Sequence, residues 1–172
     1  MAKVELIVPF FLKWETEKYT ENKNDRGGAT KYGVTLATWQ NCGYDKNHDG
    51  HIDKEDVKLL THDDFVMVVT KYFNTWCGDK INNQSVALLL IDWVWASGAW
   101  GIKIPQRLLG VKADGIVGQK TIEALNAVKQ DTFFAKVWVE RKKFIDDICL
   151  NDVSQLGNKN GWMNRLKSIN YK

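Results

Sequence analysis

The sequence predicts a mainly α-helical protein that carries one small polar β-hairpin and one acidic loop inserted between helices. Apolar residues recur at intervals of three and four over most of the chain, and capping residues stand where these patterns begin and end. The length of 172 residues, with 44% hydrophobic and 26% charged residues, is ordinary for one globular domain. We therefore expect a single mainly α domain over residues 1–172.

The first half is predicted to alternate short helices with polar loops. Residues 4–18 fit an amphipathic helix, in which Pro9 favours a start near residue 8. Residues 19–34 are polar and rich in glycine, which is typical of a loop or a short hairpin. Further helices are expected over residues 35–43, 53–60 and 61–78, with Thr35 and Thr61 as N-terminal caps.

The second half is predicted to contain the buried centre of the fold. The run NQSVALLLIDWVWASG is apolar on nearly every side, which is typical of a helix buried all round. Trp39, Trp76, Trp93 and Trp138 lie on apolar helix faces and are expected in the core. Further helices are expected over residues 119–129, 132–151 and 161–170.

Composition and charge argue against several classes of protein. The formal net charge is only +3, and acids and bases alternate along the chain, which is unlike the basic stripe of a nucleic-acid-binding protein. No apolar run approaches the roughly 20 residues that span a bilayer. Cys42, Cys77 and Cys149 have no metal-ligand or disulfide spacing, so we expect free thiols. We expect a monomer, made in the cytoplasm without a signal peptide, that reaches any extracellular target after release or by another export route.

Residues 45–56, DKNHDGHIDKED, match the spacing of a twelve-residue EF-hand calcium loop, with Gly50 at the sharp turn. Calcium binds six to eight oxygen atoms, and this spacing wraps such atoms around one ion. The expected Ca²⁺ ligands are Asp45, Asn47, Asp49, the backbone carbonyl of His51, Asp53 through water, and Asp56. Asp56 stands where glutamate is usual and is one methylene shorter. A lone loop favours a structural ion, and the alternative is an acidic turn that binds only water.

Glu15, Asp25 and Thr30 form the candidate catalytic set. Glycoside hydrolysis requires a carboxylic acid that protonates the leaving oxygen, and an opposite group that holds water or forms a covalent bond. Glu15 stands near the end of the first predicted helix, and an aspartate and a threonine on the following hairpin can orient the attacking water. Spacing alone leaves open that Glu15 is a solvated charge at a helix end.

The stretch FFLKWE…NDRGGATKYGVTLATWQ resembles the N-terminal signature of the family-108 glycoside hydrolases, which are N-acetylmuramidases with a lysozyme-like fold. The second part of that signature is filled by Asp25, Gly27, Gly28, Thr30, Gly33, Val34 and Thr35. The resemblance implies that Glu15 is the acid, and the order glutamate, aspartate, threonine resembles a triad whose last two members hold water. Thr16 and Glu17 replace two glycines of the signature. This leaves Glu17 as an alternative acid and loss of activity as an alternative outcome.

Residues 104–125 resemble the peptidoglycan-binding half attached to these muramidases. The matching positions are Gln106, Leu109, Gly110, Asp114, Gly115, Gly118 and Thr121. The resemblance implies a catalytic half over residues 1–85, a peptidoglycan-binding-like half over residues 86–172, and glycan strands as substrate. It implies cleavage of the β-1,4 bond after N-acetylmuramic acid. The rival functions are a non-catalytic peptidoglycan-binding protein and a calcium-dependent interaction protein.

Two further residues are candidate substrate contacts. Tyr32 lies in the polar hairpin, where it can stack on a sugar or pack within the hairpin itself. Asp92 lies inside the most apolar helix, where it can face a sugar cleft or serve as a hydrogen-bonded structural acid. The sequence leaves both alternatives open for each residue.

Overall fold

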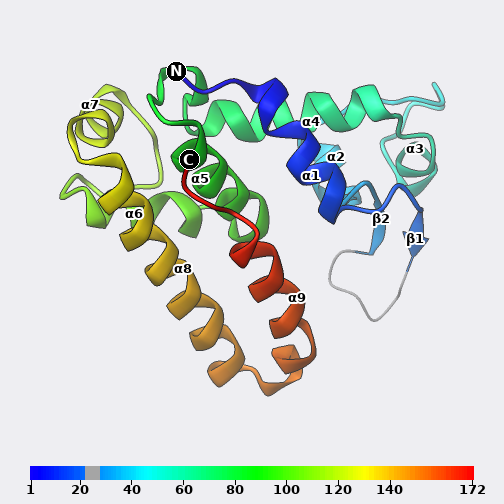
Figure 1. Cartoon of the computed structure of the whole chain (residues 1–172). Coiled ribbons are helices and arrows are strands. Elements are labelled where there is room, and N and C mark those ends of the chain that lie inside the picture. Colours follow the sequence, from blue (N-terminus) through cyan, green and yellow to red (C-terminus); the bar gives the residue numbers. More distant parts are fainter. Residues whose placement is uncertain (22–27) are drawn as a thin grey trace. The chain divides into compact units, whose positions relative to one another are not determined.

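The computed structural model describes residues 1–21 and 28–172 and is mainly helical with one small sheet, as the sequence predicts (Figure 1). The chain divides into two compact units, Val4–Lys71 and Met1–Lys3 with Tyr72–Lys172. This division falls inside one helix, α4 (His62–Thr75). None of the described helices is long and apolar enough to cross a membrane.

The unit Val4–Lys71 contains the predicted polar hairpin, which is a three-stranded antiparallel sheet in the order β1-β2-β3. The central strand pairs Thr30 with Thr20 on one side and with Thr35 on the other. The elements are η1 (Val4–Leu6), α1 (Val8–Trp14), β1 (Thr20–Glu21), β2 (Ala29–Lys31), β3 (Val34–Thr35), α2 (Leu36–Cys42), α3 (Lys54–Lys58) and the greater part of α4 (His62–Thr75).

Helix α1 is shorter than predicted. It begins with proline in its first turn, where the missing N–H costs no helical hydrogen bond. It ends at Trp14, because Glu15 adopts an extended conformation (φ −101°, ψ 139°) while its N–H still donates to the Phe11 carbonyl at 3.0 Å. Phe11 is fully buried and anchors the helix. Glu15 therefore follows the helix as its C-terminal cap.

Helix α2 begins and ends where its sequence predicts. The Thr35 hydroxyl accepts a hydrogen bond from the Thr38 N–H, which satisfies one of the free donors of the first turn. Trp39 is fully buried, and Gly43 leaves room for its ring, since a Cβ atom at that position would overlap the indole. The helix is thus fixed by its cap and by one large core residue.

In the second unit, α5 is the buried centre. Nine of its fourteen residues are buried, Trp93 fully. Asn83 caps it by accepting hydrogen bonds from the N–H groups of Ser85 and Val86. Figure 1 shows α8 and α9 running side by side, and they are in contact. The elements are η2 (Gly78–Lys80), α5 (Gln84–Ser97), α6 (Trp100–Leu108), α7 (Gln119–Ala127), α8 (Gln130–Asn151), η3 (Val153–Gln155) and α9 (Leu156–Lys167).

The loop between α6 and α7 is built around the buried side chain of Gln106. Its carbonyl oxygen accepts from the Gly115 N–H at 2.9 Å, and its amide donates to the Ile116 carbonyl at 2.9 Å. Gly110 and Gly115 have φ values of +70° and +82°, which glycine adopts without strain. The motif of residues 104–125 therefore has a structural role in closing this loop.

Three of the four tryptophans predicted in the core, Trp39, Trp76 and Trp93, are fully buried. Trp138 differs, because it is half-buried and its indole N–H donates to the Leu166 carbonyl at 3.3 Å. The three cysteines are free, as expected.

Candidate active site

The side chain of Glu15 lies against the turn between β2 and β3. It is partly buried, and a Cβ atom built on Gly33 would overlap its carboxyl group. The backbone reinforces this placement, since the Tyr32 N–H donates to the Thr16 carbonyl at 2.8 Å. A backbone hydrogen bond therefore holds the segment after α1 against the turn, and Gly33 in the turn leaves space for the Glu15 carboxyl group.

The turn itself explains the position of Tyr32. Tyr32 and Gly33 have φ values of +54° and +69°, which is the conformation of a two-residue type I′ hairpin turn. Tyr32 is only 8% exposed, and the centroid of its ring lies 5.6 Å from that of Phe65. Burial, with a smaller effect of Glu17, raises the pKa of Tyr32. The structure thus supports packing within the hairpin, and a contact with a sugar stays a prediction.

Thr30 lies on the central strand of the sheet. It is half-buried, and its hydroxyl donates to the Gly28 carbonyl at 3.2 Å. Asp25, the third predicted catalytic residue, lies outside the described residues. Glu17, the alternative acid, is exposed, whereas Glu15 is partly buried. Of the two glutamates, Glu15 is the one held against the hairpin.

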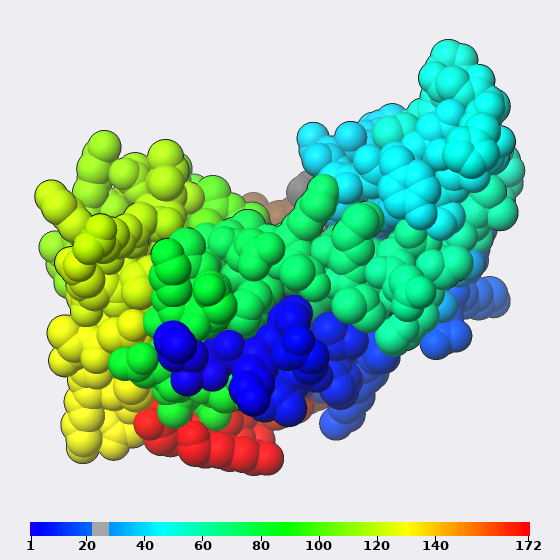
Figure 2. Space-filling model, turned by 90° about the horizontal axis from the view of Figure 1, so that it is seen from above, coloured from blue at the N-terminus to red at the C-terminus, as the bar shows by residue number. Residues whose placement is uncertain are grey.

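The acidic loop of residues 45–56 turns sharply at Gly50. The Asp45 carboxylate accepts from the N–H groups of His48 at 2.7 Å and Gly50 at 2.8 Å, and Gly50 has a φ of +92°. Asn47 and Asp49 are exposed and are hydrogen-bonded to each other. In Figure 2 the cyan region of this loop projects at the edge of its unit.

Asp56 closes the loop through the backbone. It is fully buried, and its carboxylate accepts from the N–H groups of Lys46 at 2.6 Å and Asp53 at 2.8 Å. Burial raises the pKa of Asp56, but these hydrogen bonds outweigh burial and hold it below its ordinary value. Asp53 caps α3 by accepting from the Glu55 N–H.

The loop supplies oxygen donors and the turn that a calcium loop requires, which fits a hard cation in chemistry. The carboxylate at position twelve of the loop belongs to Asp56 and accepts hydrogen bonds from backbone N–H groups. Among the described residues, no three or more side chains of histidine, cysteine, aspartate or glutamate are grouped as a metal site. Calcium binding therefore stays a prediction.

Asp92 is a structural acid. It has no exposed surface, and its two oxygens lie 2.7 Å from guanidinium nitrogens of Arg141 and Arg165. Burial raises the pKa of Asp92, but the two guanidinium groups outweigh burial and lower it overall. The full burial of the Asp92 carboxylate supports the structural alternative, and a direct contact with substrate stays a prediction. Sequence reasoning missed both arginines, which lie on α8 and α9 with no local pattern that links them to Asp92.

Comparisons with known proteins cover nearly the whole chain. The family model described as "Glycosyl hydrolase 108" matches residues 8–98, and the model described as "Predicted Peptidoglycan domain" matches residues 100–167. Among solved structures, the chain resembles SagA of Brucella abortus, with 25% sequence identity and a TM-score of 0.76, over 96% of this chain and 90% of that one. Comparison with curated proteins gives no significant match.

Proposed function

Because the chain belongs to the glycosyl hydrolase 108 family, we propose that it cleaves the β-1,4 bond between N-acetylmuramic acid and N-acetylglucosamine, with Glu15 as the acid. The family makes the chain a glycoside hydrolase, and the peptidoglycan domain that follows makes peptidoglycan its polymer. Our proposal adds the identity of the glycosidic bond that is cleaved and the roles of the catalytic residues.

The observation that carries the proposal is the position of Glu15. Its carboxyl group lies against Gly33 at a turn whose preceding strand carries Thr30. A general acid must be held in one place relative to the glycosidic oxygen, and the fastening of α1 to this turn provides that. Glu15 donates its proton to the leaving oxygen, while Asp25 and Thr30 hold the water that attacks the sugar carbon.

The residues that replace two glycines after Glu15, Thr16 and Glu17, cause no backbone strain. Among the described residues, positive φ values occur at Tyr32, His48, Cys77 and six glycines, and neither Thr16 nor Glu17 is among them. The backbone after Glu15 therefore adopts a conformation that any residue tolerates. The replacement of the two glycines therefore gives no conformational argument for the rival of a peptidoglycan-binding protein that has lost catalysis.

The experiment is to incubate purified protein with peptidoglycan, reduce the products with borohydride, and identify the new sugar ends by mass spectrometry. Cleavage of the proposed bond gives reduced muramic acid ends. Reduced glucosamine ends would show that the wrong bond is proposed. Binding without any new reducing ends would support the non-catalytic rival.

We also propose that the loop of residues 45–56 binds one Ca²⁺ that stabilises its unit. The turn at Gly50 and the exposed oxygens of Asn47 and Asp49 support this. No contact in the described part of the chain favours the loop as a surface for a protein partner. Calorimetry with calcium tests the stoichiometry, which we expect to be one to one.

A further inference from the structure

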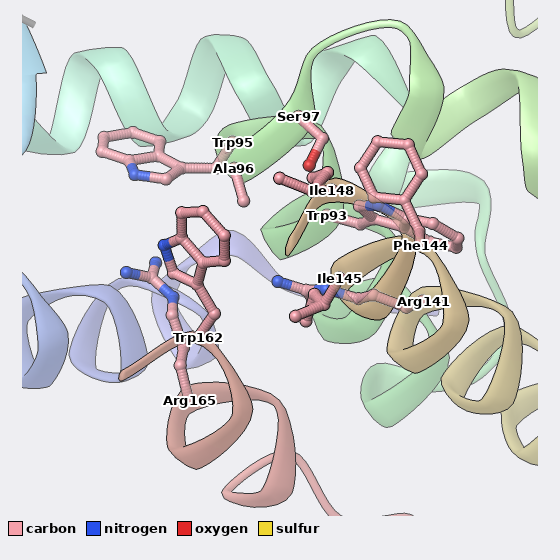
Figure 3. Close-up of a pocket in the computed structure, with 10 residues that line it drawn as sticks. All are labelled: Trp93, Trp95, Ala96, Ser97, Arg141, Phe144, Ile145, Ile148, Trp162 and Arg165. Atoms are coloured by element: carbon pink, nitrogen blue, oxygen red, sulfur yellow. The ribbon is translucent and has the colours of Figure 1, made fainter. Parts of the chain in front are cut away.

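A cavity of about 260 Å³ lies within the second unit and has no role in the chemistry proposed above. Side chains of α5, α8 and α9 line it (Figure 3). Both family matches contribute to it, because α5 belongs to the first match and α8 and α9 belong to the second. Its volume is below the roughly 300–1,000 Å³ of sites for drug-sized ligands, so it suits one small chemical group. The lining residues are Trp93, Trp95, Ala96, Ser97, Arg141, Phe144, Ile145, Ile148, Trp162 and Arg165.

The charged groups beside the cavity already have partners. The two oxygens of Asp92 lie 2.7 Å from guanidinium nitrogens of Arg141 and Arg165. Arg141 also donates to the Leu89 carbonyl at 3.5 Å, and Arg165 has a further interaction besides the pair with Asp92. A charged ligand would have to compete with these partners. A neutral ligand therefore suits the cavity better than a charged one.

Most of the wall is apolar. Figure 3 shows the rings of Trp95 and Trp162 on one side of the space and the ring of Phe144 on the other. These three residues are half-buried, so part of each side chain stays exposed and can contact a ligand. A methyl group packs favourably against such a wall, because burial removes apolar surface from water.

One hydroxyl group adds a polar contact to this wall. Figure 3 shows the Ser97 hydroxyl directed into the space between the aromatic rings. Ser97 is half-buried, and within the described part of the chain its hydroxyl forms no hydrogen bond. A hydroxyl group can donate to a carbonyl oxygen or accept from an amide N–H. An apolar wall with a few polar groups is the usual composition of a ligand site.

We propose that this cavity binds the acetamido group of an N-acetylated sugar of the peptidoglycan glycan. This inference rests on the proposed function, because it takes peptidoglycan as the polymer. The acetamido group is neutral and small. It joins a methyl group, which suits the aromatic wall, to a carbonyl oxygen and an N–H, either of which can bond to the Ser97 hydroxyl. The cavity thus makes the second unit selective for N-acetylated sugars.

Binding of soluble tetrasaccharides tests the proposal independently of catalysis. The probes are chitotetraose, a β-1,4 tetramer of N-acetylglucosamine, and cellotetraose, which has a hydroxyl group in place of each acetamido group. Calorimetry measures both affinities with the full chain. We expect chitotetraose to bind about tenfold more tightly, since one buried methyl group and one hydrogen bond each contribute roughly a factor of four. Equal affinities would overturn the proposal.

Two variants assign this preference to the cavity. Ser97→Ala removes the hydroxyl group, and Trp162→Leu removes one aromatic face. We expect each variant to lower the preference for chitotetraose about fourfold and to leave binding of cellotetraose nearly unchanged. The matched control is Trp138→Leu, which removes a half-buried tryptophan that does not line the cavity.

The control should keep the full preference, and an equal loss in the control would show a general effect on the fold and contradict a site. A preference that persists in both cavity variants would place acetamido recognition elsewhere and reject the proposal. If Trp162→Leu fails to fold by circular dichroism, Ser97→Ala decides alone, since its hydroxyl bonds to no described residue.

Saturation-transfer NMR identifies the bound group directly. The acetyl methyl protons of chitotetraose should receive more saturation from the protein than the protons of the sugar rings, and Trp162→Leu should reduce this difference. Stronger saturation of the ring protons would show that a sugar ring occupies the cavity and would contradict the proposal.

The cavity and the proposed cleavage fail separately. If the protein releases no reducing ends from peptidoglycan, the proposed function fails, while the tetrasaccharide results still decide the cavity. If reducing ends appear but neither cavity variant changes the preference for chitotetraose, the cavity proposal fails and the cleavage stands.

Discussion

The carboxyl group of Glu15 lies over the Cα atom of Gly33, in the space that a Cβ atom would occupy. Two separate physical reasons therefore favour glycine at this position. Its φ of +69° is a conformation that other residues adopt only with strain, and its missing side chain admits the carboxyl group. The glycine that a turn requires is thus also the glycine that positions the proposed acid.

Gly33→Ala should strongly reduce turnover. The new methyl group must displace the Glu15 carboxyl group, and the left-handed backbone should cost about 1–2 kcal/mol of stability. The measurements are the initial rate of reducing-end release and the melting temperature. Gly110→Ala is the matched control, because its φ is +70° and no described atom lies within 4 Å of the Cβ position. Equal loss of turnover in both variants would show that backbone strain, and not the carboxyl position, matters.

Glu15→Gln should remove most turnover and leave the fold intact. The amide has nearly the same shape as the acid, and the N–H of residue 15 that bonds to Phe11 belongs to the backbone. Loss of general-acid catalysis should lower kcat by roughly 10²–10⁴-fold. Glu17→Gln, at an exposed neighbouring position, should keep nearly full activity. The opposite outcome for the two variants would identify Glu17 as the acid.

The elements that could be predicted from the sequence are those fixed by neighbouring residues. Helix α2 lies between a capping threonine, Thr35, and Gly43, and both act within one turn of the chain. The apolar run of α5 predicts burial, because few other environments accommodate it. The predicted end of α1 at residue 18 is wrong. The periodic pattern of the sequence continues beyond Trp14, whereas the backbone becomes extended at Glu15.

The features that could not be predicted depend on residues far apart in the chain. Asp92 is neutralised by Arg141 and Arg165, which are 49 and 73 residues away. Tyr32 carries an aromatic ring that can equally face solvent or the core, and the two-residue turn decides in favour of burial. The family motif identified Gly33 by its position, and only the structure gives the reason, which is the carboxyl group of Glu15.

Asp92→Asn should destabilise the protein substantially. It removes the carboxylate that pairs with the nearly buried Arg141 guanidinium group, and breaking a buried ion pair in this way costs about 3–5 kcal/mol. Denaturant unfolding measures the change in the free energy of unfolding. Asp146→Asn is the control, because Asp146 pairs with Lys142 and Lys159 in contact with solvent, where ion pairs contribute little. A cost no larger than that of the control would contradict a structural role for Asp92.

Acid should destabilise the protein through its buried carboxylates. The pKa values of Asp56, Asp64 and Asp92 lie below their ordinary value in the folded protein, despite burial, because backbone or cationic partners hold the charged forms. Their contribution to stability is complete above the unfolded-state pKa of about 4 and is lost as the pH falls through the folded-state values. The melting temperature should therefore be nearly constant above about pH 5 and should fall below about pH 4. Asp56→Asn should be less stable and should show a shallower fall, and a slope equal to that of the unmodified protein would contradict the assignment.

Calcium should raise the melting temperature by mass action, since the ion binds the folded loop. Asp45→Ala combined with Asp49→Ala should abolish that increase. An increase that persists in the double variant would place the ion elsewhere, and no increase in the unmodified protein would show that the loop binds no calcium.

Removing calcium should lower turnover only modestly. The loop begins just after α2, and α2 follows directly the strand β3 that pairs with Thr30 on β2, so the loop is connected to the proposed site. Turnover should depend little on the ion, because other contacts hold α2 and the loop in place. Trp39 anchors α2 in the core, and Asp56 closes the loop through backbone hydrogen bonds. Lytic rate and helical circular dichroism should be measured together, with calcium and with a chelator, below the melting transition. Loss of activity at an unchanged dichroism signal would mean that the loop is a switch, because a purely stabilising ion affects turnover only through the folded fraction.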